Sequence, residues 1–188
     1  MLQRNAGPQS QTGLAAPGHT EGARGEPHSL PAPSVPAEKT VVGEQHLVFS
    51  LLDREFALQA EYIQGVERLA DVTVIPHVAS WVAGVINLRG SISSVVDLRT
   101  FLEREKLPYN PRTRLLSVKY NEMLICLVVD SVSEMVPIAP NTIDSTMHDI
   151  PSWVVSYASG MAMVGKRRVI LLDAARLLFA DKMHHYST

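Results

Sequence analysis

Few side chains in the sequence have types and spacings suited to catalysis. His77 and Ser80 lie close together after a proline, but no acid is placed beside them to complete a hydrolytic triad. His148 and Asp149 are neighbours in a stretch that has the composition of a turn. The chain also has no phosphate-binding glycine loop, no paired-histidine zinc helix and no nucleophile elbow. We therefore expect a protein that is not an enzyme.

Metal and cofactor chemistry is equally poorly represented. His184 and His185 are adjacent near the C-terminus without acidic or cysteine residues that would complete a ligand set. The lone cysteine, Cys126, alternates within an apolar run and is expected to be a small buried hydrophobic residue. A single cysteine excludes an internal disulfide framework and suits a reducing compartment. We expect no metal and no cofactor.

Three consecutive cations, Lys166, Arg167 and Arg168, follow a glycine at an expected hairpin tip. Such a tip can contact nucleic acid, as small β-barrels often do. The alternative is a solvated turn whose charges keep it soluble. The formal net charge of −2 and the lack of aromatic residues among these cations favour the solvated turn.

Arg89 is the strongest candidate for a binding residue. It stands at the end of an expected strand and precedes Gly90, which can adopt a positive φ. A guanidinium on a rigid turn presents a planar fork of donors to a carboxylate or to helix carbonyls of a partner. An internal salt bridge to Asp71 or Glu67 is the alternative. Because a second copy of this segment has Gly165 at the same point, Arg89 serves a purpose that only one copy has.

That second copy belongs to an internal duplication that positions these residues. Gly84 aligns with Gly160, and Asp97 aligns with Asp173, without a gap. The segments before them also correspond, since Leu47-Val48-Phe49, Phe56-Ala57-Leu58, Ile63 and Val66 match Leu116-Ser117-Val118, Ile125-Cys126-Leu127, Val132 and Met135. Two copies are too few for a solenoid. The duplication predicts two packed lobes with a groove between them.

Alternating apolar residues predict five short strands in each copy. The expected strands are 45–52, 55–58, 63–69, 82–88 and 92–96, followed by 114–120, 123–129, 131–136, 160–164 and 168–172. Helix is expected only after Asp97 and Asp173, whose carboxylates can cap a first helical turn, and as a short turn at 79–82. A long connection is expected at 137–156. The pattern predicts a mainly β fold of two small five-stranded barrels with a short C-terminal helix.

The composition divides the chain. Residues 1–44 hold six of the 12 prolines and six of the 11 glycines, with no Phe, Trp or Tyr. Such a segment cannot bury enough apolar surface to fold, so we expect a disordered tail. The predicted domain covers 45–182, with lobes at about 45–110 and 111–182, and 183–188 form a C-terminal tail. With no signal peptide and no apolar stretch long enough to span a bilayer, the sequence predicts a cytoplasmic protein.

The ordered set of motifs resembles the CheW family of chemotaxis coupling proteins. The resemblance covers roughly residues 45–180 and is specific as a set, although each motif alone is weak. It is carried by Leu47-Val48-Phe49 with Phe56-Ala57-Leu58, by Pro76 followed by Gly84-Val85-Ile86-Asn87-Leu88-Arg89-Gly90, by Val96-Asp97-Leu98-Arg99, by Val128-Val129-Asp130-Ser131-Val132-Ser133-Glu134-Met135, and by Leu171-Leu172-Asp173.

This resemblance implies two five-stranded Src-homology-like β-barrels and a non-enzymatic adaptor. Such an adaptor couples the cytoplasmic hairpin tip of a methyl-accepting chemoreceptor to the regulatory domain of a CheA-type histidine kinase. It would sit in the cytoplasm at the membrane-associated receptor array, and its pathway would control flagella, pili or another output. The nucleic-acid-binding barrel that uses Lys166 to Arg168 is the alternative function.

The resemblance also implies which residues contact the receptor, whereas it names none for the kinase. The implied receptor-binding residues are Arg89, Ile63, Val66, Gly84 and Asn87. Two departures from the family pattern affect this surface. Gly65 replaces a glutamate that is usual before position 66, and Ser94 stands where proline is common. We expect Gly65 to weaken its strand and to alter the receptor edge.

Overall fold

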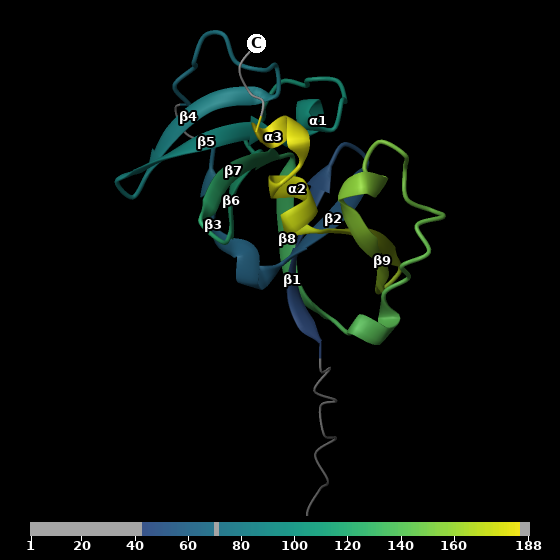
Figure 1. Ribbon diagram of the computed structural model, residues 1–188. Helices are drawn as coiled ribbons and strands as arrows, with labels where there is room; N and C mark the ends of the chain where they lie inside the picture. Colours follow the sequence, from purple (N-terminus) through teal and green to yellow (C-terminus); the bar gives the residue numbers. More distant parts are fainter. Residues whose placement is uncertain (1–42, 70–71, 185–188) are drawn as a thin grey trace, which may run out of the picture. The chain divides into compact units, whose positions relative to one another are not determined.

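The computed structural model describes residues 43–69 and 72–184 (Figure 1). The predicted disordered tail at 1–44 lies outside these ranges except for its last two residues. Asp71 and residues 185–188 of the predicted C-terminal tail also lie outside them. Within the described ranges, no helix is long and apolar enough to cross a membrane.

Ten strands form two five-stranded antiparallel and parallel mixed sheets. Sheet A has the order β8 (Ser131–Ile138), β1 (Glu44–Leu51), β2 (Arg54–Gln59), β10 (Arg167–Leu172) and β9 (Ala158–Val164). Sheet B has the order β3 (Ile63–Arg68), β6 (Arg114–Tyr120), β7 (Met123–Val129), β5 (Ser91–Asp97) and β4 (Val82–Leu88). The helices are α1 (Leu98–Phe101), α2 (Ala174–Leu178) and α3 (Asp181–His184), with 3₁₀ turns η1 (Ala60–Tyr62), η2 (Pro140–Thr142) and η3 (Val155–Tyr157).

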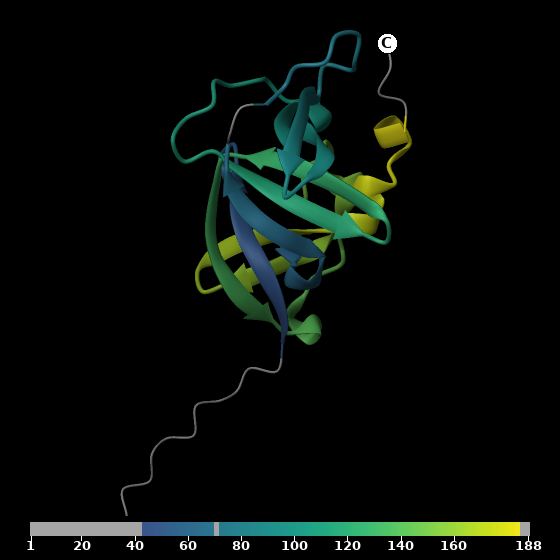
Figure 2. The same ribbon diagram turned by 90° about the vertical axis from the view of Figure 1, so that its left-hand side faces the viewer.

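The mainly β architecture and the two groups of five strands agree with the sequence, but two details differ. The sheets are open, because β8 and β9 are unpaired edges of sheet A and β3 and β4 are edges of sheet B, so "barrel" overstates their closure. The lobes are also not the sequence halves 45–110 and 111–182. Each sheet combines the first two strands of one copy with the last three strands of the other, as the blue β1 beside the green β8 shows (Figure 2).

The exchange is the same in both directions, since corresponding residues of the two copies pair in the same register. In sheet B, Ile63 lies opposite Val118 and Val66 opposite Leu116; in sheet A, Val132 lies opposite Phe49 and Met135 opposite Leu47. Both pairings contain a register shift at the same place. The parallel pairs β5–β7 and β10–β2 also correspond, since they contain Val95 opposite Cys126 and Leu171 opposite Ala57. The duplication therefore produces a two-fold pseudosymmetric pair of sheets.

The apolar side chains are buried in three clusters. A central core contains residues of both sheets together with those of α1 and α2, among them Phe49, Phe56, Phe101, Leu116 and Leu177. Each sheet also covers a smaller apolar cluster of its own on its other face. Strands with apolar residues on both faces need partners on both sides. Both sheets therefore bury apolar residues on each of their faces.

The connections show smaller differences from the expectations. The segment 79–82 forms a turn at 80–81 that leads directly into β4 instead of a helical turn. The long connection begins after Ile138, because β8 extends two residues beyond the predicted end, and it contains η2 and η3. The short helix α3 follows α2 and was not predicted separately; its Met183 is buried against the central core.

Candidate functional site

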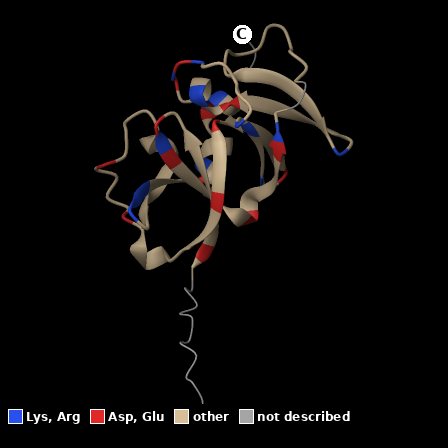
Figure 3. Ribbon diagram, turned by 180° about the vertical axis from the view of Figure 1, so that it is seen from behind, with Lys and Arg blue, Asp and Glu red and all other residues tan. Residues whose placement is uncertain are grey.

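The turn between β4 and β5 contains the strongest candidate, Arg89. Arg89 and Gly90 are the two residues between the strands, and both have positive φ angles, of 53° and 88°. Positive φ at both central positions is the geometry that matches the twist of a two-residue hairpin. The Asn87 side-chain Oδ1 accepts a hydrogen bond of 2.9 Å from the Gly90 amide. The turn is therefore well defined, and its tip is basic (Figure 3).

The Arg89 side chain reaches back across sheet B to the edge strand β3. Its Nη2 lies 3.4 Å from Oε1 of Glu67, yet the side chain remains 78% exposed. Gly65 leaves room for this contact, because a Cβ there would lie 3.6 Å from the Arg89 Nη2 and 3.3 Å from the Glu67 Oε1. An exposed pair of this kind contributes only about 0–1 kcal/mol. The internal partner that the sequence suggested is thus present, but it leaves most donors of the guanidinium exposed.

A shallow pocket of about 250 Å³ lies beside Arg89. Polar and apolar side chains from all five strands of sheet B line it, including Gln64, Glu67, Leu88, Lys119 and Leu124. Among the five receptor-binding residues that the resemblance implies, Arg89 alone lines this pocket.

Ile63 and Val66 lie on the other face of β3. The bulge between Ile63 and Gly65 aligns both with Val118 and Leu116, which belong to the central core, whereas Glu67 lies opposite Leu115. Ile63 is partly buried against that core, and Val66 is 41% exposed. Ile63 and Val66 therefore lie on the core-facing side of β3, whereas Glu67, the partner of Arg89, lies on its other face.

Gly84 has a structural reason for being glycine. Its φ is +144°, and a Cβ there would lie 2.2 Å from the Thr73 carbonyl oxygen. Thr73 and Val85 exchange two backbone hydrogen bonds of 2.9 Å directly beside it. Gly160 is packed against Asp144 in the same way in the second copy. Gly84 and the turn-forming Asn87 therefore shape the site through contacts within the chain.

The carboxylates of Asp97 and Asp173 accept backbone hydrogen bonds at the starts of α1 and α2, each of 3.0 Å, from Arg99 and Arg176. Asp97 also accepts a hydrogen bond of 2.9 Å from the Tyr109 hydroxyl. Burial, reinforced by the Asp97 charge, raises the pKa of Tyr109.

A buried ion pair beside α1 was missed at the sequence level. The Arg99 guanidinium is 3% exposed, and its Nε donates to the Asp130 Oδ1 at 2.6 Å. The Arg99 Nη1 donates to the Leu107 carbonyl, and the Asp130 Oδ2 accepts from the Leu52 amide at 2.7 Å. The only local sign of it was Arg99 at the second position of α1, between apolar residues, because buried arginines are rare unless paired.

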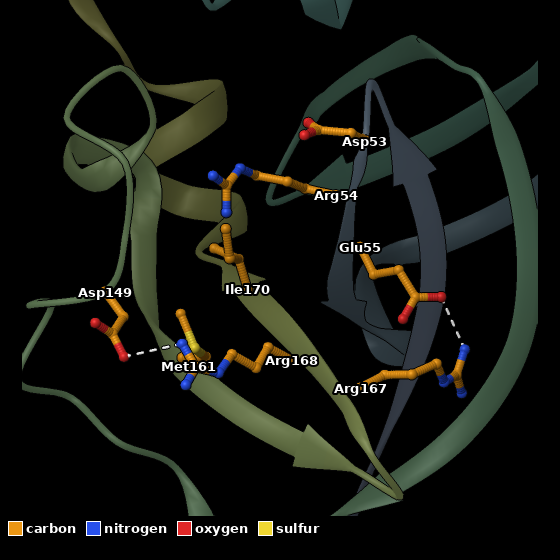
Figure 4. Close-up of a pocket in the computed structure, with 8 residues that line it drawn as sticks. All are labelled: Asp53, Arg54, Glu55, Asp149, Met161, Arg167, Arg168 and Ile170. Carbon is orange, nitrogen blue, oxygen red and sulfur yellow. Dashed lines mark hydrogen bonds and ion pairs between the residues drawn. The ribbon is translucent and has the colours of Figure 1, made fainter.

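Two of the three candidate nucleic-acid-binding cations, Arg167 and Arg168 at the start of β10, pair with carboxylates (Figure 4). Arg167 bonds Glu55 at 2.8 Å and also pairs with Glu134, which raises the pKa of Arg167. Arg168 lies 3.2 Å from Asp149. Across the molecule, basic residues stand among acidic ones instead of forming one basic surface (Figure 3). This arrangement gives no support to the nucleic-acid alternative.

These side chains surround a pocket of about 290 Å³ on sheet A (Figure 4). Arg54 extends into it toward Ile170. Acidic and basic groups alternate around the pocket, so no single charge dominates it.

The remaining polar candidates do not assemble into a reactive site. Cys126 is buried, its Sγ lies 3.9 Å from the Ser117 Oγ, and burial raises the pKa of its thiol. Within residues 43–69 and 72–184, no three side chains of His, Cys, Asp or Glu are grouped as metal ligands.

Comparison with known proteins supports a specific family. The family model described as a CheW-like domain matches residues 45–182. The chemotaxis protein CheW of Klebsiella aerogenes is 27% identical over 142 residues, which cover 76% of this chain and 86% of that protein. The chemotaxis protein CheW of Bacillus subtilis is 28% identical over 103 residues, which cover 55% of this chain and 66% of that protein.

A solved structure agrees with the fold. The crystal structure of the scaffolding protein TtCheW from Thermoanaerobacter tengcongensis superposes with a TM-score of 0.67 at 25% identity. The match covers 74% of this chain and 94% of the TtCheW chain. Because the family model spans nearly all of the described residues and the paired sheets match a solved scaffold, the chain belongs to the CheW family of chemotaxis coupling adaptors.

Proposed function

We propose that this protein couples the cytoplasmic hairpin of a methyl-accepting chemoreceptor to the regulatory domain of a CheA-type histidine kinase. It does so by binding alone, without a chemical step, in the cytoplasm at the receptor array. One observation carries this proposal. The two sheets have corresponding free edge strands, β3 and β8, but only sheet B has a turn with an exposed arginine, Arg89.

The duplication supplies two corresponding apolar positions on free edge strands. Val66 on β3 is 41% exposed, and its counterpart Met135 on β8 is 51% exposed. Met163 on the other edge of sheet A is 58% exposed. Isolated exposed hydrophobic residues need no explanation, but matched ones on unpaired edges suit two partner surfaces.

Arg89 distinguishes the two edges. Its guanidinium is 78% exposed beside β3, whereas the corresponding turn of sheet A has Gly165. A planar fork of donors suits the carboxylates and terminal carbonyls of a helical hairpin. We therefore assign the receptor to β3 and the β4–β5 turn of sheet B.

We then assign the kinase to sheet A, which has Met135 and Met163 on its edge strands. Methionine side chains adapt to the shape of a partner surface. Since the two sheets have separate free edges, both partners can bind at the same time. Each contact is small, and the array supplies strength through avidity.

A pull-down tests this assignment. Tagged wild type and the Arg89→Asp variant are incubated with lysate of the native host, and captured proteins are identified by mass spectrometry. Wild type should retrieve a multidomain histidine kinase and chemoreceptors, and Arg89→Asp should keep the kinase but lose the receptors. Retrieval of receptors by both proteins would remove Arg89 from the receptor surface, and retrieval of no kinase would reject the function.

A second variant of the proposed receptor surface is Val66→Asp, which is preferable to Ile63→Asp. Ile63 packs against the central core, so a buried carboxylate there would unfold the edge. Val66 is exposed enough for Asp to remain solvated. Val66→Asp should lose receptors with an unchanged circular dichroism spectrum, and Met135→Asp on sheet A is its matched control, which should instead lose the kinase.

A further inference from the structure

A third pocket lies beside Asp173, at the end of sheet A, and Arg89 does not line it. Its volume is about 330 Å³. Side chains of β1, β2, β9 and β10 form its walls, including His46, Gln59, Ser159 and Leu171, and Tyr62 and Tyr120 also line it. The function proposed above does not use this pocket.

The internal duplication shows what fills the corresponding place in the other copy. The counterparts of His46, Gln59, Ser159 and Leu171 are Leu115, Val128, Ala83 and Val95, at the same register offsets as the paired strands. Those four residues form one apolar cluster, and the ring of Tyr109 packs against it. The Tyr109 hydroxyl donates a hydrogen bond of 2.9 Å to the Asp97 Oδ2.

Asp97 and Asp173 consequently differ in their surroundings. Asp97 is 2% exposed, whereas the Asp173 side chain is 31% exposed. The Asp173 Oδ1 accepts the Arg176 amide, but the Oδ2 has only a long contact of 3.5 Å with the Arg176 Nε. Among the described residues, no tyrosine bonds Asp173 as Tyr109 bonds Asp97.

The pocket also contains a buried acceptor. His46 is 3% exposed, and its Nδ1 bonds the Glu44 carbonyl oxygen at 2.8 Å. A carbonyl can only accept, so Nδ1 is the donor and a neutral ring leaves Nε2 as an acceptor. His46 therefore adds an acceptor to a pocket that already has the Asp173 carboxylate. Ile143 and Leu171 supply apolar wall.

We propose that this pocket receives a tyrosine side chain of a partner protein, with the ring against Leu171 and Ile143 and the hydroxyl donating to Asp173. The occupant repeats what Tyr109 does at Asp97. The more polar walls, with His46 and Ser159 in place of Leu115 and Ala83, suit a side chain that enters from water and leaves again. A partner tyrosine would thereby anchor on sheet A, in a pocket that neither Arg89 nor Val66 lines.

The test uses the full chain and a small probe, so its result does not depend on the chemoreceptor or the kinase. N-acetyl-L-tyrosinamide is titrated into the ¹⁵N-labelled protein, and N-acetyl-L-phenylalaninamide is the matched probe without the hydroxyl. Saturable shifts are expected at the amides of Ala174, Ala175 and Tyr62. The phenylalanine probe should bind on the order of tenfold more weakly, because it lacks one hydrogen bond to a charged group.

Two variants locate the binding. Asp173→Asn retains a helix-capping side chain but removes the charge, and it should reduce tyrosine binding to the level of the phenylalanine probe. Arg54→Gln, in the separate pocket of Figure 4, is the control and should change nothing. Equal binding of the two probes by wild type, the absence of saturable shifts, or stronger binding of N-acetyl-L-lysinamide would each overturn the proposal. These comparisons on wild type hold even if Asp173→Asn fails to fold.

Discussion

Arg89 adopts a left-handed backbone conformation, with φ of 53°, at the position where the second copy has Gly165 with φ of 61°. A non-glycine residue in this region costs roughly 1–2 kcal/mol. The fold retains the strain although a glycine would remove it, and among the described residues the guanidinium pairs only with the exposed Glu67. Strain at an exposed arginine therefore supports our proposal that Arg89 binds a partner.

Replacing Arg89 by glycine should therefore separate binding from folding. Arg89→Gly removes the strain but increases the entropy of the unfolded chain, so the free energy of unfolding should change by less than about 1 kcal/mol. Receptor capture should nevertheless be lost. Urea denaturation measures the first effect and the pull-down measures the second. Stability falling together with capture would mean that Arg89 acts on the fold.

Substitution of Gly84, unlike that of Arg89, should strongly lower the free energy of unfolding. In Gly84→Ala the new Cβ would meet the Thr73 carbonyl oxygen at 2.2 Å, so the loop at 72–73 must move and lose its bonds to Val85. We expect a loss of about 3 kcal/mol or more. Gly90→Ala is the control, because no atom lies within 4 Å of its Cβ position, and only the cost of a φ of +88° remains. Equal midpoints in urea for the two variants would contradict this.

Cys126 allows a test of pH dependence. Burial raises the pKa of its thiol in the folded protein. Its contribution is therefore complete below the unfolded value of about 8.5 and decreases as the pH rises toward the folded value, because the unfolded thiol ionises first. The stability difference between wild type and Cys126→Ala, which has the residue found at the counterpart Ala57, should shrink above about pH 8.5. A difference that grows with pH would show that the thiolate is stabilised.

At the level of the strands, the sequence contained most of the elements but not their partners. Alternating residues placed all ten strands within two residues of their observed ends, with the largest differences at the end of β8 and the start of β9. Pairing is a long-range property, so nothing local in β1 or β2 indicates that their neighbours are β8 and β10 of the other copy.

The candidate site shows the same division. The turn that presents Arg89 could be predicted, since Asn87 and Gly90 are local signals. The separation of Ile63 and Val66 from Arg89 could not, because it depends on a bulge at Gly65. The contact of Arg99 with Asp130 joins residues 31 positions apart and leaves no local pattern.

That buried pair connects α1, the start of β8 and the β1–β2 turn. Asp130→Asn leaves the Arg99 charge buried without compensation and should cost about 3 kcal/mol. Glu67→Gln is the control for an exposed pair, with an expected change below about 0.5 kcal/mol, because the Arg89 side chain is 78% exposed. Thermal denaturation of both variants measures the difference, and a tolerated Asp130→Asn would show that the backbone bonds at Leu52 and Leu107 suffice.

At the level of the whole molecule, duplication followed by divergence explains how one small protein can join two others. The shared core makes the sheets one unit, so neither can move independently without exposing it. The edges have diverged, with Arg89 and Val66 on sheet B and Met135 and Met163 on sheet A. A rigid body with two different edges holds its partners at a fixed geometry, which is what an adaptor requires.

The coupling role is tested most directly by sedimenting the kinase with receptor-containing membrane vesicles of the native host, with and without the protein. The kinase should sediment only when the protein is present. Arg89→Asp should abolish that sedimentation while still binding the kinase in solution, and Met135→Asp should reach the vesicles without the kinase. Kinase that sediments equally well without the protein would contradict the coupling role.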